Sequence, residues 1–356
     1  MIHLDLFNPS LTSSLPNNVL ISQVTDYVIC SININYTEVY RTTLYEKNGY
    51  ATFYDLRAIV EDYMIYNGLS EVVFSMEVEY EQGGGGEMTQ EVCMVYSSIK
   101  PLNKNDENFL ASEFLTTRRC ITAPRGYPLQ LLYFTDIQDD YKAVFDCRLL
   151  RNGEIKECVV EYPIQSPQGP DIYALQADSD FVTQLCAEAL ELENPGKLLS
   201  AAVRIENRHM TIYYTEDKPI ASFFFRNAFN AWEYLHLVGK DIMKTDISRK
   251  EAVCQGVTSY YDQTVDKKHV VETCPLTQDE AAWFNEFLTS RTVRLVERRD
   301  NENFDVFISD ITSEIQADAA EPTVIKFSWR LADNADWRKQ EFPPQIFNDT
   351  YNPTFQ

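Results

Sequence analysis

Two Asn-Gly pairs, each flanked by runs of alternating apolar and polar residues, constrain the fold of this 356-residue chain most strongly. Asn48-Gly49 separates the runs 40–45 and 50–54, and Asn152-Gly153 separates longer runs that begin at Tyr141. A tight β-hairpin requires positive φ at both turn positions, which asparagine and glycine tolerate. Alternation places every second side chain on one buried face. The sequence therefore predicts antiparallel β-hairpins in the first half of the chain.

The stretch 256–295 predicts the best-defined helix of the chain. Glu280 follows Thr277 by three residues, which is the spacing of a capping box. The apolar residues that follow recur at the helical period and define one buried face: Trp283, Phe284, Phe287 and Leu288. Strand, turn and strand are expected before this helix, and a further strand is expected after it.

The order of two strands, a helix and two strands is predicted three times along the chain. The first helix follows Asp55, which can cap it, and the second begins near Ser179. The predicted fold class is therefore a β-rich α+β fold of tandem β-sandwich or barrel-like modules, each with one short helix. Residues 99–126 are interpreted as a connector. We place the modules at 1–104, 105–219 and 220–334, followed by a C-terminal arm at 335–356.

The net charge of −23 disfavours nucleic acid as a partner. The chain has 54 acidic and 31 basic residues, and its compact basic runs are only two residues long. Binding to a phosphate backbone requires clustered lysine and arginine. A solvated acidic surface is the simpler interpretation.

The eight cysteines are spaced unlike metal ligands. No two form a CxxC pair, and most lie in apolar runs. The chain opens without a basic segment followed by an apolar one, which is the pattern of a signal peptide. We expect buried free thiols in a protein made in the cytoplasm. No window approaches the run of about 18 apolar residues that a membrane span requires.

Motifs of known catalytic and cofactor chemistry are not evident. The four histidines are scattered, without HxH or HExxH spacing, and there is no GxSxG elbow or dinucleotide fingerprint. The glycines 83–86 lead into Glu87 and a strand, whereas a phosphate-binding loop leads into lysine and a helix. These patterns predict no catalytic residues, no metal site and no cofactor, and they favour a protein that is not an enzyme.

The last residues differ in composition from the rest of the chain. Prolines at 343, 344 and 353 oppose regular strand pairing. Aromatic and aliphatic residues nevertheless recur, so an extended segment that docks on this chain or on a neighbour competes with a disordered tail as an interpretation. The candidate assembly residues are Phe342, Ile346, Phe347, Tyr351 and Phe355.

The C-terminal third resembles a known group of proteins. The runs FFFRNAFNAWEYLHLVGK, GVTSYYDQTVDKKHVVETCPLTQDEAAWFNEFLTSRTVRL and FSWRLADN, between about Ser222 and Asn334, are similar to minor tail proteins of Bacteroides-type phages and prophages. Such proteins are distal-tail or baseplate-hub-like components. The resemblance implies a homo-oligomeric ring that contacts other tail proteins, no catalytic site, and a place in a virion tail.

The sequence therefore leads to two alternative hypotheses for the function. The first is a non-enzymatic structural component of a phage tail or related injection apparatus, which closes into a ring and buries strand edges between subunits. The second is a β-sandwich module that binds a glycan or protein on a host surface. Exposed tryptophans would stack on sugars in the second case, and the candidates are Trp232, Trp329 and Trp337.

Overall fold

The computed structural model describes residues 2–80, 86–101, 104–136, 140–165, 170–254, 257–296, 303–312 and 322–332. Across these residues 23 strands accompany four α-helices and one 3-10 helix, Thr12–Ser14. The prediction of a β-rich α+β chain is confirmed. Four clusters of buried hydrophobic residues divide the elements into three modules and a junction.

The N-terminal module is a sandwich of two sheets. Its larger sheet has the order β2 (Ser10–Leu11), β9 (Val92–Val95), β7 (Glu71–Tyr80), β4 (Tyr27–Ile34), β5 (Thr37–Tyr45), with β8 (Gly86–Met88) pairing β7. Its smaller sheet has the order β1 (Ile2–His3), β3 (Val19–Ser22), β6 (Tyr50–Phe53). Helix α1 (Leu56–Tyr66) buries Leu56, Val60 and Met64 in the core that the two sheets share.

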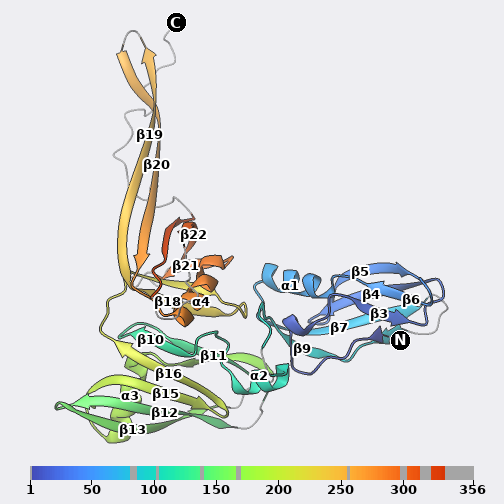
Figure 1. Ribbon diagram of the computed structural model, residues 1–356, viewed down its shortest axis with the longest axis horizontal. Coiled ribbons are helices and arrows are strands. Elements are labelled where there is room, and N and C mark those ends of the chain that lie inside the picture. The colour runs from blue at the N-terminus through green and yellow to red at the C-terminus, as the bar shows by residue number, and fades with distance from the viewer. Residues whose placement is uncertain are drawn as a thin grey trace, which may run out of the picture.

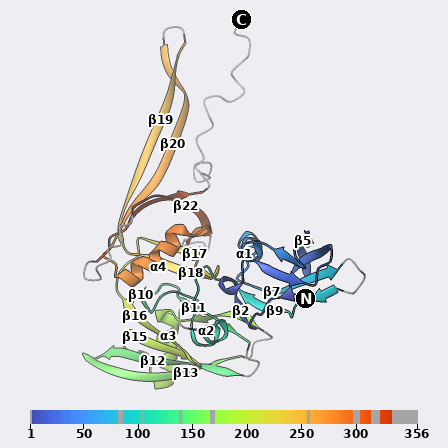
Figure 2. The same ribbon diagram turned by 45° about the vertical axis from the view of Figure 1, so that its right-hand side comes forward.

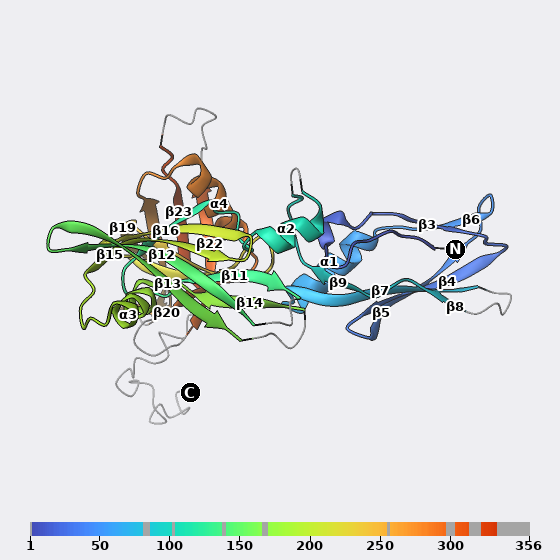
Figure 3. The ribbon, with the colours of Figure 1, turned by 90° about the horizontal axis from the view of Figure 1, so that it is seen from below.

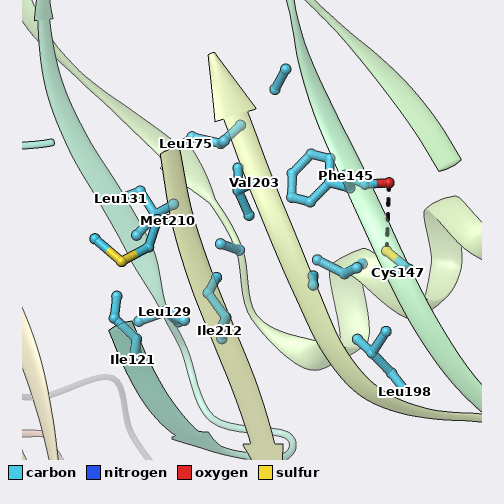
Figure 4. Packing of buried hydrophobic residues seen from close by; sticks show 14 of the residues in the cluster. Ile121, Leu129, Leu131, Phe145, Cys147, Leu175, Leu198, Val203, Met210 and Ile212 are labelled. Atoms are coloured by element: carbon cyan, nitrogen blue, oxygen red, sulfur yellow. Dashed lines mark hydrogen bonds between the residues drawn. The ribbon is translucent and has the colours of Figure 1, made fainter. Parts of the chain in front are cut away.

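The middle module repeats this plan. Its larger sheet has the order β10 (Cys120–Pro124), β16 (Arg208–Thr215), β15 (Lys197–Ile205), β12 (Tyr141–Arg151), β13 (Glu154–Ile164). A second sheet pairs β11 (Gln130–Thr135) with β14 (Asp171–Gln176), and α3 (Ser179–Leu190) packs on the same core. Figure 4 shows how Phe145, Val203 and Ile212 from three neighbouring strands gather near Leu131 and Leu175 of the second sheet.

The first two modules share their connectivity as well as their element order. In each, the first strand of the long hairpin (β4 or β12) pairs antiparallel with the strand after the helix (β7 or β15). In each, a short strand from before the hairpin (β2 or β10) joins the far side of the sheet in parallel. The two sheets therefore have equivalent strand orders, which the sequence indicated only as a similar order of elements.

The C-terminal module is a single sheet with one helix on its face. The sheet has the order β18 (Trp232–Leu237), β17 (Ala221–Arg226), β21 (Val293–Val296), β22 (Asn303–Thr312), β23 (Lys326–Leu331), β20 (Val257–Thr273), β19 (Gly239–Cys254). Helix α4 (Gln278–Thr289) lies across this sheet at the foot of the β19–β20 hairpin (Figure 2). Phe287 contacts the rings of Phe223, Phe225 and Phe327 with centroid separations of 5.1–5.8 Å.

Helix α4 begins as the sequence predicts. The Thr277 hydroxyl accepts the Glu280 amide at 3.3 Å, and the Glu280 carboxylate accepts the Thr277 amide at 2.9 Å. These two bonds form the reciprocal capping box. The predicted apolar face is buried, because Trp283, Phe284, Phe287 and Leu288 are all at most 6% exposed.

Four local predictions were wrong. Asn48-Gly49 forms a tight turn, but the strands on its two sides belong to different sheets, because β5 pairs with β4 and β6 pairs with β3. The strand, turn and strand expected before α4 are one 17-residue strand, β20, whose hairpin partner is the upstream strand β19. The connector at 99–126 contains a helix, α2 (Asp106–Ser112), capped by the side chain of Asn105, so the middle range has two helices. Asp55 does not cap α1 with its side chain; it lies in the left-handed region with φ 59°.

The modules are arranged around the junction rather than in a row. The N-terminal module extends to one side of the other two, and the middle and C-terminal modules lie against each other (Figures 1 and 3). Helix α2 lies at the meeting point, where Asp106 accepts hydrogen bonds from Ser10 Oγ at 2.8 Å, the Leu11 amide at 2.9 Å and Ser14 Oγ at 2.8 Å.

Phe287→Ala tests the packing of α4 on its sheet. Removal of a fully buried ring should lower the free energy of unfolding of the C-terminal module by about 3–5 kcal/mol. Phe307→Ala, at a position 58% exposed in the same sheet, should change it by less than about 0.5 kcal/mol. Urea unfolding followed by tryptophan fluorescence measures both, and equal effects of the two variants would contradict this packing.

Candidate assembly surface

The most prominent surface feature is the hairpin of β19 and β20, which we call the arm. Its strands have 16 and 17 residues, so the arm is about 50 Å long at roughly 3.3 Å per residue. It projects away from the rest of the molecule (Figure 1). The sheet holds it only at its base, where β23 pairs with residues 269–272 of β20. Ion pairs of Lys268 with Asp310 at 3.2 Å and of Arg330 with Asp266 at 3.7 Å complete this attachment.

The rest of the arm is an isolated two-stranded ribbon within the part of the chain that the structure describes. Every side chain from Ile242 to Val253 is exposed. Directly opposed residues in an antiparallel pair share a face, and successive residues alternate between faces. The pairing register therefore assigns each side chain of the arm to one of two faces.

One face is mostly charged. Lys244 lies opposite Lys268, Asp246 opposite Asp266 and Lys250 opposite Asp262, with a Lys250–Asp262 ion pair of 2.8 Å. The other face is mixed. It carries five apolar residues that we call the arm stripe, Met243, Ile247, Val253, Tyr260 and Val265, and between them lie Thr245, Arg249, Glu251, Gln263 and Lys267. Met243, Ile247, Val253 and Tyr260 are 52–71% exposed. Apolar residues that remain in water lack the burial that stabilises a sheet.

The arm stripe continues the face of the sheet that α4 covers. Val271 lies two residues beyond His269 on β20, and these two residues are paired with Phe327 and Trp329 of β23. Val271, Phe327 and Trp329 are 1–5% exposed in the core beneath α4. His269 stacks on Trp329 with ring centroids 4.0 Å apart, and its Nδ1 donates to the Asp241 carboxylate at 2.7 Å. The stripe residues thus continue, on the arm, the face of the sheet that α4 covers at its base.

One loop of the C-terminal module contacts both other modules. This junction loop, 227–231, connects β17 to β18. The amide of the Asn227 side chain donates to the Leu115 carbonyl at 2.8 Å, and that of Asn230 donates to the Leu69 carbonyl at 2.8 Å. The Ala228 carbonyl accepts the Ser98 amide at 2.9 Å.

Phe229 at the centre of the junction loop is fully buried. It stacks on Phe109 of α2 at 5.8 Å, in a cluster with Leu11 and Val95 of the N-terminal module and Phe134 of the middle module. Nothing in the run FRNAFNAW predicts this role, since an Asn- and Ala-rich turn between strands is typical of an exposed loop. Its residues interact with segments more than 100 positions away, and such contacts leave no local pattern.

Carboxyl groups with raised pKa values lie at both sides of the junction. Burial raises the pKa of Glu71 to about 9, and Asp171 of the middle module adds to this by its hydrogen bond and its charge. Burial also raises the pKa of the neighbouring Cys93 thiol to about 12. The negative charges of Glu71, Asp136 and Asp171 add to this shift. Burial also raises the pKa of Glu286 in α4 to about 7, although hydrogen bonds from Thr117 and the Ala228 amide oppose the shift.

A cleft of about 270 Å³ lies between the middle and C-terminal modules. Apolar and aromatic residues line most of it, among them Leu129, Tyr234 and Trp283. The Arg118 guanidinium lies over the Trp283 ring, 3.1 Å from its centroid, and pairs with Glu233 at 3.4 Å. These contacts join the modules, because they link the segment before β10 to α4 and β18.

The predicted site residues fall into three groups. The helix residues Thr277 to Leu288 form the α4 core contact described above. The assembly candidates Phe342, Ile346, Phe347, Tyr351 and Phe355 lie outside the described residues, as does Trp337. Trp329 is 5% exposed, and Trp232 stacks on Phe224 at 4.7 Å with Arg226 and Arg294 over its ring. Neither Trp232 nor Trp329 therefore offers an open ring face to a sugar.

The described residues contain no group of three or more His, Cys, Asp or Glu side chains that could hold a metal ion. Among the helices described, none has the length and apolarity needed to cross a membrane. Seven of the eight cysteines are described, and all seven are free thiols. Four of them are buried, but Cys120 and Cys274 are exposed, which corrects the expectation that the cysteines are buried throughout.

Comparisons with known proteins leave the family open. No protein family and no curated protein matches the sequence. Among solved structures, two of the plexin A4 extracellular region match at a TM-score of 0.21 and 9% identity. The matches cover 90% of this chain but only 35% and 30% of the plexin chains, so this chain spans well under half of their length. Similarity at this level does not establish a shared fold.

The raised pKa values of Glu71 and Glu286 predict that the free energy of unfolding depends on pH. An unfolded glutamate ionises near 4.5, whereas folded Glu286 and Glu71 hold their protons to about 7 and about 9. The folded state therefore binds more protons in this range, and the free energy of unfolding should fall as pH rises from about 4.5 to about 9. Glu71→Gln should flatten the fall between pH 7 and 9, and Glu286→Gln should reduce it below pH 7.

Urea unfolding at a series of pH values measures this dependence. Glu157→Gln is the control, because the Glu157 side chain is 76% exposed on β13. A profile for Glu71→Gln that is as steep as that of the unmodified protein would contradict the raised pKa of Glu71.

Phe229→Ala tests the junction loop. The loss of a buried ring at the meeting point should uncouple the modules, so that one unfolding transition separates into two or more and proteases cut near residues 99–118 at least tenfold faster. Phe7→Ala, at a position 55% exposed, is the control. A single unshifted transition for Phe229→Ala would show that the loop does not hold the modules together.

Proposed function

We propose that this protein is a non-enzymatic structural component of a phage tail or related injection apparatus, and that copies of it assemble into a ring. The observation that carries the proposal is the arm, a long ribbon that projects from the rest of the molecule. The resemblance of residues 222–334 to phage tail proteins supports the same function.

The open edge of β19 provides the contact. Strand β19 ends the described order of its sheet, so its outer backbone groups have no strand partner among the described residues. Such an edge can add a strand from another chain. A strand edge that meets a different surface of the next copy is a heterologous contact, and repeated heterologous contacts close into a ring when the rotation allows.

Charge favours a second copy as the partner. The arm, residues 239–273, contains six basic and six acidic residues, so the net charge of −23 belongs to the rest of the chain. Two acidic bodies repel each other, whereas a neutral arm with Lys244, Arg249 and Lys250 on its outer strand can approach an acidic body. Lysines on an edge also oppose pairing of two identical edges, which disfavours uncontrolled association.

Shortening the arm tests this function. Ile247 and Val265 are directly opposed, so replacing residues 248–264 by Asn-Gly keeps the register at the base. We expect the full chain to form an oligomer of three or more copies at micromolar concentration and the shortened chain to be a monomer, measured by size-exclusion chromatography with light scattering.

Matched unfolding midpoints would show that the shortened chain remains folded.

A second, milder variant with Lys244, Arg249 and Lys250 all replaced by Glu should weaken assembly at least tenfold by charge repulsion. A full chain that stays monomeric up to the highest soluble concentration would overturn the ring proposal.

A further inference from the structure

Assembly through the edge of β19 would leave the five apolar residues of the arm stripe exposed to water. The five stripe residues lie on the continuation of the α4-covered face, but α4 ends at Thr289 and packs on the base of the sheet. Whatever covers the stripe must be apolar and extended and must have access to the base of the arm.

The direction of β23 indicates where such a segment starts. Strand β20 runs from the tip of the arm to its base, and β23 is antiparallel to it, with Lys326 opposite Glu272 and Trp329 opposite His269. The chain therefore leaves β23 heading toward the tip, beside β20. The described part ends at Ala332, whose amide donates to the Asp305 carbonyl at 2.8 Å.

The 24 residues from 333 to 356 are long enough to reach the tip. From the level of residue 267 to the tip at residue 257 the distance is roughly 33 Å, at about 3.3 Å per residue. A segment of 24 residues spans up to about 80 Å when extended. Even a path bent by prolines can follow the whole stripe.

The composition of this segment fits an apolar face better than a sheet edge. Prolines 343, 344 and 353 lack the amide hydrogen that a further strand would need, yet they are compatible with extended backbone. The last twelve residues carry a single charge, Asp349, and four of the five predicted assembly residues lie among them: Ile346, Phe347, Tyr351 and Phe355.

We propose that residues 335–356 dock on the arm stripe of their own chain, as an extended cover that replaces α4 beyond the base of the sheet. Attachment to β23 gives the segment a high effective concentration at the arm, which favours its own chain over a second copy. Arg249 lies on the docking face, over the Tyr260 ring at 5.1 Å. The proposal does not depend on ring formation, since it concerns the stripe and not the edge of β19.

Site-specific photocrosslinking tests the proposal on the full chain. Phe347→p-benzoylphenylalanine should yield, on irradiation, crosslinks to residues 243–265 of the same chain, identified by mass spectrometry in a mixture of light and isotope-labelled protein. The same reagent at Tyr66, which is 91% exposed on α1, is the control and should not react with the arm. Crosslinks that join light to heavy chains, or that fall outside the arm, would overturn the proposal.

Two matched substitutions on the arm complete the test. Ile247→Ser, on the stripe, should reduce the crosslink yield at least fivefold. Ile242→Ser, equally exposed on the opposite face, should leave the yield unchanged. Truncation after Asn334 should raise amide hydrogen exchange in residues 243–265 at least tenfold relative to the full chain. Equal yields for the two variants, or unchanged exchange on truncation, would show that the stripe is not the docking face.

Discussion

Burial of Phe229 between three modules is the contact on which the remaining architecture depends. The ring lies in a cluster formed by the N-terminal module, helix α2, the middle module and its own loop. Full burial of one phenylalanine contributes about 1.5–3 kcal/mol, and the side-chain amides of Asn227 and Asn230 add hydrogen bonds to two other modules. Interfaces between modules in one chain otherwise permit relative motion. This junction joins the C-terminal module, which carries the arm, to the two other modules.

Local signals explain which parts of the fold the sequence could predict. The Asn152-Gly153 turn determines a hairpin because both strands lie within a few residues of it, and Asn152 and Gly153 adopt the expected positive φ of 53° and 81°. Asn48 and Gly49 also have positive φ, but they lead from one sheet to the other, because β5 pairs with β4 and β6 pairs with β3. The capping box of α4 is equally local. The partner of β20 was not predictable in the same way, since Gln255 and Gly256, which lie between β19 and β20 in the sequence, are not an Asn-Gly pair. In addition, the pairing register of the two strands shifts between Lys250 and Glu251.

The candidate site was predictable only in part, for a related reason. The aromatic composition of residues 335–356 favoured a docking segment, but the face that we propose for it required the pairing register of β19 and β20. Ile247 and Val265 are 18 positions apart and share a face only because of that register. The role of the junction loop was not predicted at all. In the sequence Phe229 is a single apolar residue between two strands, and only the tertiary fold places Phe109 and Phe134 against it.

An isolated two-stranded ribbon is marginally stable in water, which favours a cover over part of the arm. Cross-strand pairs such as Lys250 with Asp262 contribute about 0.2–1 kcal/mol each, which is small against the entropy of ordering more than 20 residues. Each stripe residue gains about 1.5–3 kcal/mol if it is fully buried, so a cover over the stripe stabilises the arm more than its own ion pairs do. A covered stripe leaves the edge of β19 and the charged face in water. The arm would then carry its structural support on one side and its contact with a neighbouring copy on another.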